Sequence, residues 1–442
     1  MNILVINGSP KGKYSITLQT VLYLEALHPE HTFTVLHAGQ RIKTLEKDFS
    51  EAVTALQSAD LILFAYPVYT FIAPCQLHRF IELVKESGVD LGGKFVTQIT
   101  TSKHFYDVTA HTYVEENCKD LGMKYIRGLS ADMDDLLTKK GQKEARDFFD
   151  YVCFSMQNDL YEPILAPRAP FTPVAVEVPL QDGEKSGDVV IIADCDHPIL
   201  QSMIDRFRAV LPRKTRVVTL REYPFSGGCL GCFNCATDGR CIYKDGFDSF
   251  LREQIQTAEA IIYAFTVKDH SMGALFKMYD DRQFCNGHRT VTMGMPMGYL
   301  ICGDLAGEAN LQTVLTARAD VGSNFLCGMA TDATSIDAMA KKLVYALENK
   351  YVPPQTFYGI GGMKIFRDLI YLMRGMMKAD HKFYKAHGQY DFPQKKKGTV
   401  LKMYLVGALI SNKKIKAKMG NAMNEGMLAP YKKLLDSIQG KK

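Results

Sequence analysis

Residues 1–157 alternate between short apolar runs and longer stretches in which apolar positions recur every three or four residues. The short runs are nearly continuous and rich in β-branched and aromatic residues, which is typical of strands buried on both faces of a parallel sheet. The longer stretches have the periodicity of amphipathic helices. This alternation predicts five β–α units that form an α/β, doubly wound parallel sheet. The predicted strands are Ile3–Asn7, Thr32–His37, Leu61–Tyr66, Phe95–Thr100 and Lys124–Leu129, and the predicted helices are Ile16–Leu27, Phe49–Leu56, Cys75–Val84, Val108–Leu121 and Lys140–Met156.

The same alternation restarts near residue 188, after a proline-rich interruption. Five of the seventeen prolines lie between Asp159 and Gly187, where neither periodicity is present, so we predict an extended linker there. The second set of runs has nearly the spacing of the first, which indicates an internal duplication and a second five-stranded sheet. Its predicted strands are Val189–Ala193, Arg216–Arg221, Ala260–Phe265, Thr290–Met295 and Ser323–Met329, and its predicted helices are Ile199–Leu211, Phe247–Gln256, Met272–Phe284, Asn310–Arg318 and Ser335–Glu348.

No strand-like run follows Tyr351. Met363–Met377 has an amphipathic pattern, Ala379–Pro393 is aromatic and polar, and Thr399–Ser411 is apolar apart from Lys402. The apolar run is shorter than the roughly 18–20 residues that span a bilayer, so it fits an interfacial helix, or a helix packed on the body or on a second subunit. The predicted organisation is a first domain at 1–158, a linker at 159–187, a second domain at 188–350 and a basic helical extension at 351–442.

The composition indicates a cellular compartment and shows that charge is unevenly distributed along the chain. No signal-peptide pattern opens the sequence, and seven of the eleven cysteines are scattered through mostly apolar segments, so we expect a cytoplasmic protein, with attachment to the periphery of a membrane as an alternative. Residues 351–442 contain 18 basic and 5 acidic residues, whereas residues 1–350 contain 35 and 43. The basic extension therefore favours an acidic protein or a membrane surface as its partner, and the acidic body argues against specific nucleic-acid binding.

Four cysteines lie within thirteen residues of a glycine-rich stretch, in the spacing C-x2-C-x2-C-x5-C. Disulfides between all four thiols would strain so short a loop, whereas closely spaced thiolates can converge on one polynuclear centre. Compact C-x2-C-x2-C runs recur among the ligand sets of iron–sulfur clusters. A structural zinc site and a metal-free reduced loop remain alternatives. The candidate metal ligands are Cys229, Cys232, Cys235 and Cys241.

The first predicted strand leads directly into the segment GSPKGKYSIT, which precedes a helix. Backbone N–H groups and the positive dipole end at a helix N-terminus form a site suited to a phosphate. Ser9, Ser15 and Thr17 can add hydroxyl donors, and Lys11 can neutralise phosphate charge. The loop lacks the Gly-Lys-Ser/Thr ending of an ATP-binding P-loop and the three-glycine fingerprint of a dinucleotide site.

Two further loops follow strands at the same predicted edge of the sheet. The segment YPVYT at 66–70 follows the third strand, and its aromatic rings could lie beside a planar ligand. Alternatively, its two tyrosines simply cap the sheet. Thr101 and Ser102 follow the fourth strand. Because the carboxyl ends of parallel strands meet at one edge, the three loops together predict a site for a phosphorylated aromatic ligand.

The segments NGSP and YPVY resemble the flavin loops of the flavodoxin-like NAD(P)H-dependent FMN reductases. The four-cysteine spacing, followed by Asp245 and by FKMYDDR at 276–282, resembles the iron–sulfur flavoproteins of that superfamily. The resemblance covers residues 1–350 and implies two tandem flavodoxin-like domains, FMN, a [4Fe–4S] cluster on the four cysteines and NAD(P)H as the electron donor. The FMN-binding residues that it implies are Ser9, Lys11, Ser15, Ile16, Thr17, Pro67, Val68, Tyr69, Thr70, Thr101 and Ser102.

The two halves depart from the family pattern in complementary ways. In the second half, the position of the phosphate loop holds Asp194 and Asp196, whose carboxylates would repel a phosphate, and the Pro-Val-Tyr element is missing. The first half has no cysteine loop. Because subunits of this family commonly pair, the duplication would build such a pair within one chain. We therefore expect FMN in the first domain to face the cluster in the second.

These features predict a flavin-dependent oxidoreductase that moves electrons between NAD(P)H, FMN and an unidentified acceptor through the cluster. Two alternatives stay open: a non-catalytic electron carrier between protein partners, and an FMN reductase whose cysteines are purely structural. His104, near the flavin loops, could assist proton movement. The sequence identifies no catalytic residue and leaves open whether the chain forms a homodimer.

Overall fold

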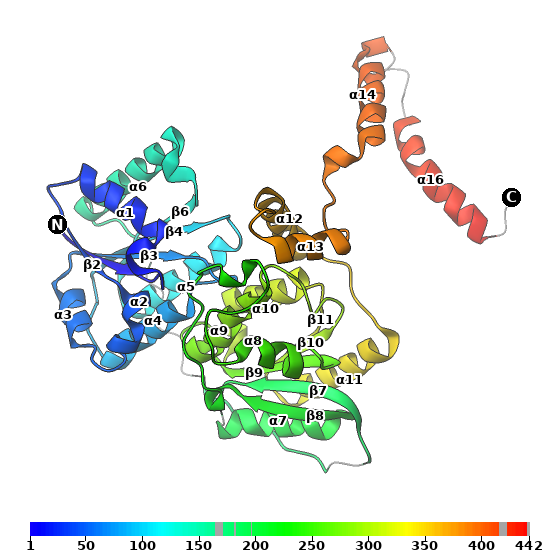
Figure 1. Cartoon of the computed structure of the whole chain (residues 1–442), viewed down its shortest axis with the longest axis horizontal. Helices are drawn as coiled ribbons and strands as arrows, with labels where there is room; N and C mark the ends of the chain where they lie inside the picture. Colours follow the sequence, from blue (N-terminus) through cyan, green and yellow to red (C-terminus); the bar gives the residue numbers. More distant parts are fainter. Residues whose placement is uncertain (164–170, 181–182, 196, 415–421, 440–442) are drawn as a thin grey trace. The chain divides into compact units, whose positions relative to one another are not determined.

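The computed structural model describes residues 1–163, 171–180, 183–195, 197–414 and 422–439. The chain divides into two compact units, Met1–Phe383 and Tyr384–Lys442. The first unit contains two parallel sheets flanked by helices (Figure 1). The fold class predicted from the sequence is therefore confirmed: two tandem flavodoxin-like, doubly wound parallel sheets are followed by a helical C-terminal extension.

The first sheet has the strand order β2-β1-β3-β4-β5, and β6 also pairs with β4. Its strands are nearly continuous apolar runs because both faces are buried: Leu4 and Ile6 belong to one hydrophobic core, and Ile3 and Val5 belong to another. The elements are β1 (Asn2–Asn7), α1 (Ile16–Leu27), β2 (Thr32–Leu36), α2 (Ala38–Leu45), α3 (Ser50–Ser58), β3 (Leu61–Pro67), α4 (Cys75–Ser87), β4 (Phe95–Ser102), α5 (Asp107–Asp120), β5 (Lys124–Tyr125), β6 (Leu129–Asp132) and α6 (Lys139–Gln157).

Two features of this domain differ from the prediction. The expected fifth strand, Lys124–Leu129, is interrupted between β5 and β6, where a Cβ atom on Gly128 would lie 2.4 Å from the Gln98 side chain. This close approach to β4 breaks the regular pairing. The short helix α2 was not predicted, and its N-terminal turn packs against the phosphate loop, since a Cβ atom on Gly39 would lie 2.3 Å from the Gly8 carbonyl oxygen.

The second sheet repeats the strand order of the first, as β8-β7-β9-β10-β11. The predicted strand Thr290–Met295 is wrong, because β10 begins at Pro296 and all its residues are buried. A proline is tolerated as the first residue of a strand, where its missing N–H breaks no ladder. The elements are β7 (Ser186–Ala193), α7 (Pro198–Val210), β8 (Arg213–Thr219), α8 (Phe247–Phe250) with a π-helical turn at Leu251–Ile255, β9 (Ala260–Thr266), α9 (Gly273–Arg282), β10 (Pro296–Cys302), α10 (Ala309–Val321), β11 (Phe325–Ala330) and α11 (Ala333–Asn349).

Of the predicted linker 159–187, the described residues 159–163, 171–180 and 183–185 contain neither helix nor strand, whereas residues 186–187 belong to β7. The Val176 N–H donates a hydrogen bond to Ser202 Oγ (3.1 Å), and Arg206 donates one to the Glu177 carbonyl (2.7 Å). Ser202 and Arg206 both belong to α7. This part of the linker is therefore fastened along the second domain.

Part of the C-terminal extension belongs to the first unit. Helix α12 (Phe357–Leu372) is held by Asp320 of α10, whose carboxylate accepts hydrogen bonds from the N–H groups of Thr356 (3.0 Å) and Gly359 (2.6 Å). Helix α13 (Lys378–Ala386) follows, and the second unit contains α14 (Lys397–Ser411) and α16 (Ala422–Ile438). Within the described residues, no helix combines the length and apolar character needed to cross a membrane.

Candidate functional site

The two domains pack through equivalent helices, α4 of the first and α9 of the second. Near its N-terminus, each helix receives a carboxylate from the other domain. The Cys75 N–H donates to Asp281 Oδ2 (2.8 Å), and the Ala274 N–H donates to Glu82 Oε1 (2.7 Å). Each carboxylate thus meets the positive end of a helix dipole. The interface has the self-complementary pattern of a two-fold dimer, built here within one chain.

The loops that follow β3 and β9 share a backbone conformation. Each contains two consecutive non-glycine residues with positive φ: Thr70 (47°) and Phe71 (73°) in the first, and Asp269 (51°) and His270 (61°) in the second. Positive φ is costly for such residues and is often found at functional sites. The two loops therefore support an internal duplication, although only the first carries the Pro-Val-Tyr element.

The eleven residues predicted to bind FMN lie on three loops at one edge of the first sheet, because β1 pairs with β3 and β3 pairs with β4. Thr17 Oγ1 lies 2.6 Å from Thr101 Oγ1, which links the start of α1 to the end of β4. Pro67 pairs with Thr101 across the sheet. The buried hydroxyl-bearing residues of these loops are Ser9, Ser15, Thr17, Thr101 and Ser102.

This edge of the sheet has the donor set that a phosphate requires. Ser15 caps α1 by accepting a hydrogen bond from the Leu18 N–H (3.3 Å). Ile16 and Thr17 contribute the first N–H groups of α1, which have no carbonyl partner inside the helix. Hydroxyl groups, helix N–H groups and the nearby Lys11 side chain together fit a phosphate ester such as that of FMN.

The cysteine loop of the second domain lies directly on these loops of the first. A Cβ atom on Gly231 would lie 1.9 Å from Tyr69 Oη and 3.3 Å from Lys11 Cε. The Lys11 ammonium also lies 5.2 Å from the centroid of the Phe233 ring, in a cation–π contact. The predicted flavin residues and the predicted metal ligands therefore form one composite site.

A second set of contacts joins the cysteine loop to the start of α4. A Cβ atom on Gly228 would lie 2.2 Å from Cys75 Sγ. The Gln76 side chain donates a hydrogen bond to the Cys229 carbonyl (3.2 Å). A side chain at position 228 would collide with the Cys75 side chain, just as one at position 231 would collide with Tyr69. The cysteine loop thus comes closest to the first domain at two glycines.

Tyr69 is enclosed between the domains. Its ring meets the Phe284 ring edge-on, with 5.9 Å between the centroids. Burial, reinforced by the neighbouring Cys229 thiol, raises the pKa of the Tyr69 phenol well above its ordinary value, so the phenol stays protonated at neutral pH. Burial also lowers the pKa of Lys11, whereas the Cys232 and Cys229 thiols act in the opposite direction.

Helix α9 holds the flavin loop through a buried ion pair that the sequence analysis missed. Lys277 donates to the Tyr69 carbonyl (2.9 Å) and to Asp281, and Thr70 Oγ1 donates to Asp281 Oδ1 (2.9 Å). Both charged residues of the pair are fully buried. Burial raises the pKa of Asp281, and the Lys277 ammonium opposes this effect. The i, i+4 spacing of Lys277 and Asp281 was the signal in the sequence that could have identified the pair.

The last residue of α9 fastens the cysteine loop at both ends. Arg282 donates to the Gly227 carbonyl (2.9 Å) before the first cysteine, and to both carboxylate oxygens of Asp245 (2.7 and 2.8 Å) after the last. Tyr243 and Phe247 flank the guanidinium group, with ring centroids 4.5 and 4.9 Å from its carbon. Burial acts to raise the pKa of Asp245, but its bonds to Arg282 outweigh burial and lower that pKa to about 2.

The four cysteines lie at different depths, and none is in a disulfide. Cys232 is exposed, and the other three are partly buried. Burial raises the pKa of Cys235 to about 11 and that of Cys229 further still. These two thiols are therefore protonated at neutral pH unless a bound cation stabilises their thiolates.

The spacing of the thiols bears on which metal they fit. Among the described side chains, no three of these sulfur atoms lie within 4.8 Å of one another. Thiolates on one zinc ion would lie closer together, because each Zn–S bond is about 2.3 Å long. In the described structure these thiols are therefore not arranged as a preformed zinc site.

Two residues singled out in the sequence have other partners. Tyr66 is fully buried, and its hydroxyl donates to Gln98 Oε1 (2.5 Å) and to the Ala110 carbonyl (3.0 Å), so it caps the sheet as the alternative interpretation held. His104 is half-exposed, and its Nδ1 lies 2.8 Å from an Asp107 carboxylate oxygen. Neither residue contacts the cysteine loop in the described hydrogen-bond network.

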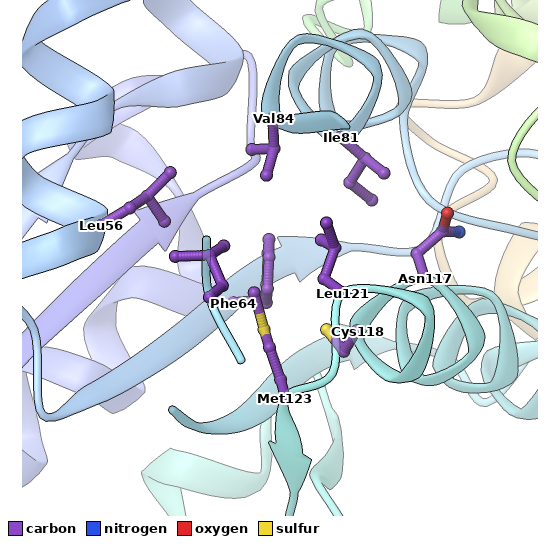
Figure 2. Close-up of a pocket in the computed structure, with 9 residues that line it drawn as sticks. Leu56, Phe64, Ile81, Val84, Asn117, Cys118, Leu121 and Met123 are labelled. Carbon is purple, nitrogen blue, oxygen red and sulfur yellow. The ribbon is translucent and has the colours of Figure 1, made fainter. Parts of the chain in front are cut away.

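A small cavity lies away from these loops, inside the first domain (Figure 2). It is an apolar gap of about 10 Å³ lined by Leu56, Phe64, Ile81 and neighbouring side chains. A volume of this size holds about one water molecule. The gap is therefore a packing defect of the core and not a cofactor site.

Comparisons with known proteins find similarity over part of the chain. Residues 1–147 match the family model of the flavodoxin-like fold. An iron–sulfur flavoprotein of Archaeoglobus fulgidus is 26% identical over 175 residues, which are 36% of this chain and 78% of the relative. An iron–sulfur flavoprotein of Clostridioides difficile is 22% identical over 139 residues, which are 28% of this chain and 61% of the relative.

Among solved structures, general stress protein 14 of Treponema denticola in complex with FMN is 14% identical, with a TM-score of 0.29; the match covers 35% of this chain and 98% of that one. The family model and the two sequence relatives confirm the resemblance drawn from the loops. Residues 1–147 are therefore similar to the flavodoxin-like fold family, and part of the chain is similar to two iron–sulfur flavoproteins.

Proposed function

We propose that this protein is a flavin-dependent oxidoreductase in which FMN on the first domain exchanges electrons with an iron–sulfur cluster on the second. The observation that carries the proposal is the approach of Gly231 to Tyr69, where a Cβ atom would lie 1.9 Å from the phenol oxygen. Two redox centres exchange electrons when their binding loops bring them close together, and these loops meet within one compact unit.

The FMN phosphate would be held by the hydroxyl groups and helix N–H groups at the carboxyl edge of the first sheet, with Lys11 balancing its charge. The segment 67–70 and the end of β4 would meet the flavin ring. When bound, FMN supplies two-electron acceptance and one-electron release. The residues proposed to bind it are Ser9, Lys11, Ser15, Ile16, Thr17, Pro67, Val68, Tyr69, Thr70, Thr101 and Ser102.

A [4Fe–4S] cluster would be bound by Cys229, Cys232, Cys235 and Cys241. Arg282 and Asp245 position the loop that carries these thiols, and the buried Lys277–Asp281 pair holds the flavin loop beneath it. Cys232 is exposed, so the cluster would have one side open to a protein or small-molecule acceptor. NAD(P)H is the proposed electron donor.

The visible spectrum of anaerobically purified protein, with iron and acid-labile sulfide analysis, tests both cofactors. We expect the absorption bands of a flavin together with the broad visible absorption of an iron–sulfur cluster. Fewer than about one iron per chain after anaerobic reconstitution would reject the cluster. Steady-state NAD(P)H oxidation without protein partners separates an enzyme from a non-catalytic electron carrier.

Flavin occupancy tests the phosphate loop separately. Ser9→Ala should lower the FMN content of the purified protein because a buried hydroxyl of the loop is lost, whereas Ser58→Ala, at an exposed position of α3, should not. Equal FMN content in both variants would reject the assignment of Ser9. This result would not affect the proposal that the four cysteines bind a cluster.

A further inference from the structure

The second unit, Tyr384–Lys442, has a strongly positive net charge, whereas residues 1–383 have a negative one. It contains thirteen lysines, no arginine and only three acidic residues, Asp391, Glu425 and Asp436, a net charge of +10. The lysines cluster at 395–397 and 413–418, on either side of α14, and again at 432–433 and 441–442. An anionic surface would therefore attract this unit along its whole length.

Helix α14 is apolar on all its sides. Lys402 is the only charged residue between Gly398 and Ser411. Its large apolar side chains are exposed, although side chains of this kind are normally buried in water-soluble proteins. With 15 residues the helix is only about 22 Å long, which is shorter than the hydrocarbon core of a bilayer. The exposed apolar residues are Val400, Leu401, Met403, Tyr404, Leu405 and Leu409.

Helix α16 carries its exposed apolar residues in a single stripe. The spacing of the stripe is i, i+1, i+4, i+7, i+8 and i+11, which places all six side chains on one helix face. Lys432 and Lys433 lie outside this stripe. The stripe consists of Met427, Leu428, Tyr431, Leu434, Leu435 and Ile438.

We infer that α14 and α16 bind the surface of a membrane that contains anionic lipid. Exposed apolar side chains would insert at the level of the acyl chains, while the flanking lysines would contact lipid phosphates. Charge complementarity favours this partner, since long lysine side chains can extend to the headgroups while their stems stay in apolar surroundings. The inference does not depend on the cofactors proposed for the first unit.

Co-sedimentation of the full-length protein with lipid vesicles tests this inference. We expect binding to vesicles that contain phosphatidylglycerol to be at least about tenfold tighter than binding to vesicles of phosphatidylcholine alone, and to weaken as salt is raised. Equal binding to both kinds of vesicle, or binding to neither, would overturn the inference.

A pair of substitutions tests the apolar surface itself. Leu405→Glu with Leu434→Glu should reduce vesicle binding by about tenfold or more, because charged groups replace inserted side chains. The matched control, Ser411→Glu with Ser437→Glu, adds the same charge at exposed polar positions and should reduce binding much less. Equal binding by the two variants would overturn the inference, as would self-association without lipid that only the leucine substitutions abolish.

Discussion

At Gly231 the cysteine loop lies directly against the segment 66–70, which is proposed to bind FMN. The φ of Gly231, 60°, lies in the left-handed region, and Tyr69 Oη fills the space that a side chain would occupy. A substitution would therefore meet both backbone strain and a steric clash. The sequence shows a glycine-rich loop, but the reason for this glycine lies in the other domain.

Gly231→Ala should destabilise the protein more than Gly246→Ala. Both glycines have positive φ, 60° and 74°, but nothing lies within 4 Å of a Cβ atom on Gly246. Strain alone costs about 1 kcal/mol, and the clash at position 231 adds about 1–3 kcal/mol. Thermal unfolding and the iron content of the two variants measure the difference. Equal losses in both would contradict the contact with Tyr69.

Arg282→Met should lower the free energy of unfolding by about 3–5 kcal/mol, because Asp245 then stays buried without its partner. Adding Asp245→Asn removes the unpaired charge and should restore part of the loss. Denaturant unfolding of the single and double variants measures this recovery. A double variant no more stable than the single one would contradict the paired arrangement.

At the scale of elements, periodicity alone predicted the order of helices and strands in both domains. Nearly continuous apolar runs identify buried parallel strands, but the strand predicted at Thr290–Met295 was misplaced, since β10 begins at Pro296. The break between β5 and β6 could not be predicted, since it follows from the packing of Gly128 against β4.

The candidate site was predictable as far as its loops, because each loop follows a strand of a parallel sheet. The contacts that hold the segment after β3 on the second domain were not. Lys277 and Asp281 act on Tyr69 and Thr70 across the α4–α9 interface, and no local pattern reports a contact between two domains.

The two reciprocal carboxylates of this interface should differ in their effect on the flavin loop. Asp281→Asn removes the nearer of the two carboxylates paired with buried Lys277, leaving Asp280 at 3.7 Å, and it weakens the bond from Thr70. We therefore expect a loss of about 2 kcal/mol in stability together with lower FMN content. Glu82→Gln, the equivalent change on the other side, should destabilise the interface but leave FMN content unchanged. Equal FMN contents in the two variants would contradict a specific role of Asp281 in holding the FMN-binding segment.

Within the first unit, the two domains pack like the subunits of a two-fold dimer, but the loops that follow β3 and β9 have different contacts. The loop after β9, which lacks the Pro-Val-Tyr element, contributes to the interface. His270 lies 2.8 Å from Asp120 of the first domain and 2.9 Å from Glu308, with Glu116 also close by. Burial lowers the pKa of His270, but the carboxylates outweigh burial and raise that pKa to about 9.

This histidine predicts a pH dependence of stability. Because its pKa is raised in the folded state from 6.5 to about 9, its contribution is complete below pH 6.5 and is lost as pH rises towards 9. The loss should be on the order of 2 kcal/mol. Urea unfolding across this pH range should show a shallower decline for His270→Gln than for the wild type. The control His104→Gln should keep the wild-type slope; an unchanged slope in His270→Gln would contradict the prediction.

We propose that FMN on the first domain and the cluster on the second face each other within one chain. The most direct test is the rate at which electrons move from the NAD(P)H-reduced flavin to the cluster, followed by rapid-mixing absorption spectroscopy at several protein concentrations. We expect first-order electron transfer from flavin to cluster, with a rate constant that does not change with protein concentration. This rate constant should be lower in Gly231→Ala than in Gly246→Ala. A rate that rises in proportion to protein concentration would mean that the two centres meet only between molecules, and would contradict the account.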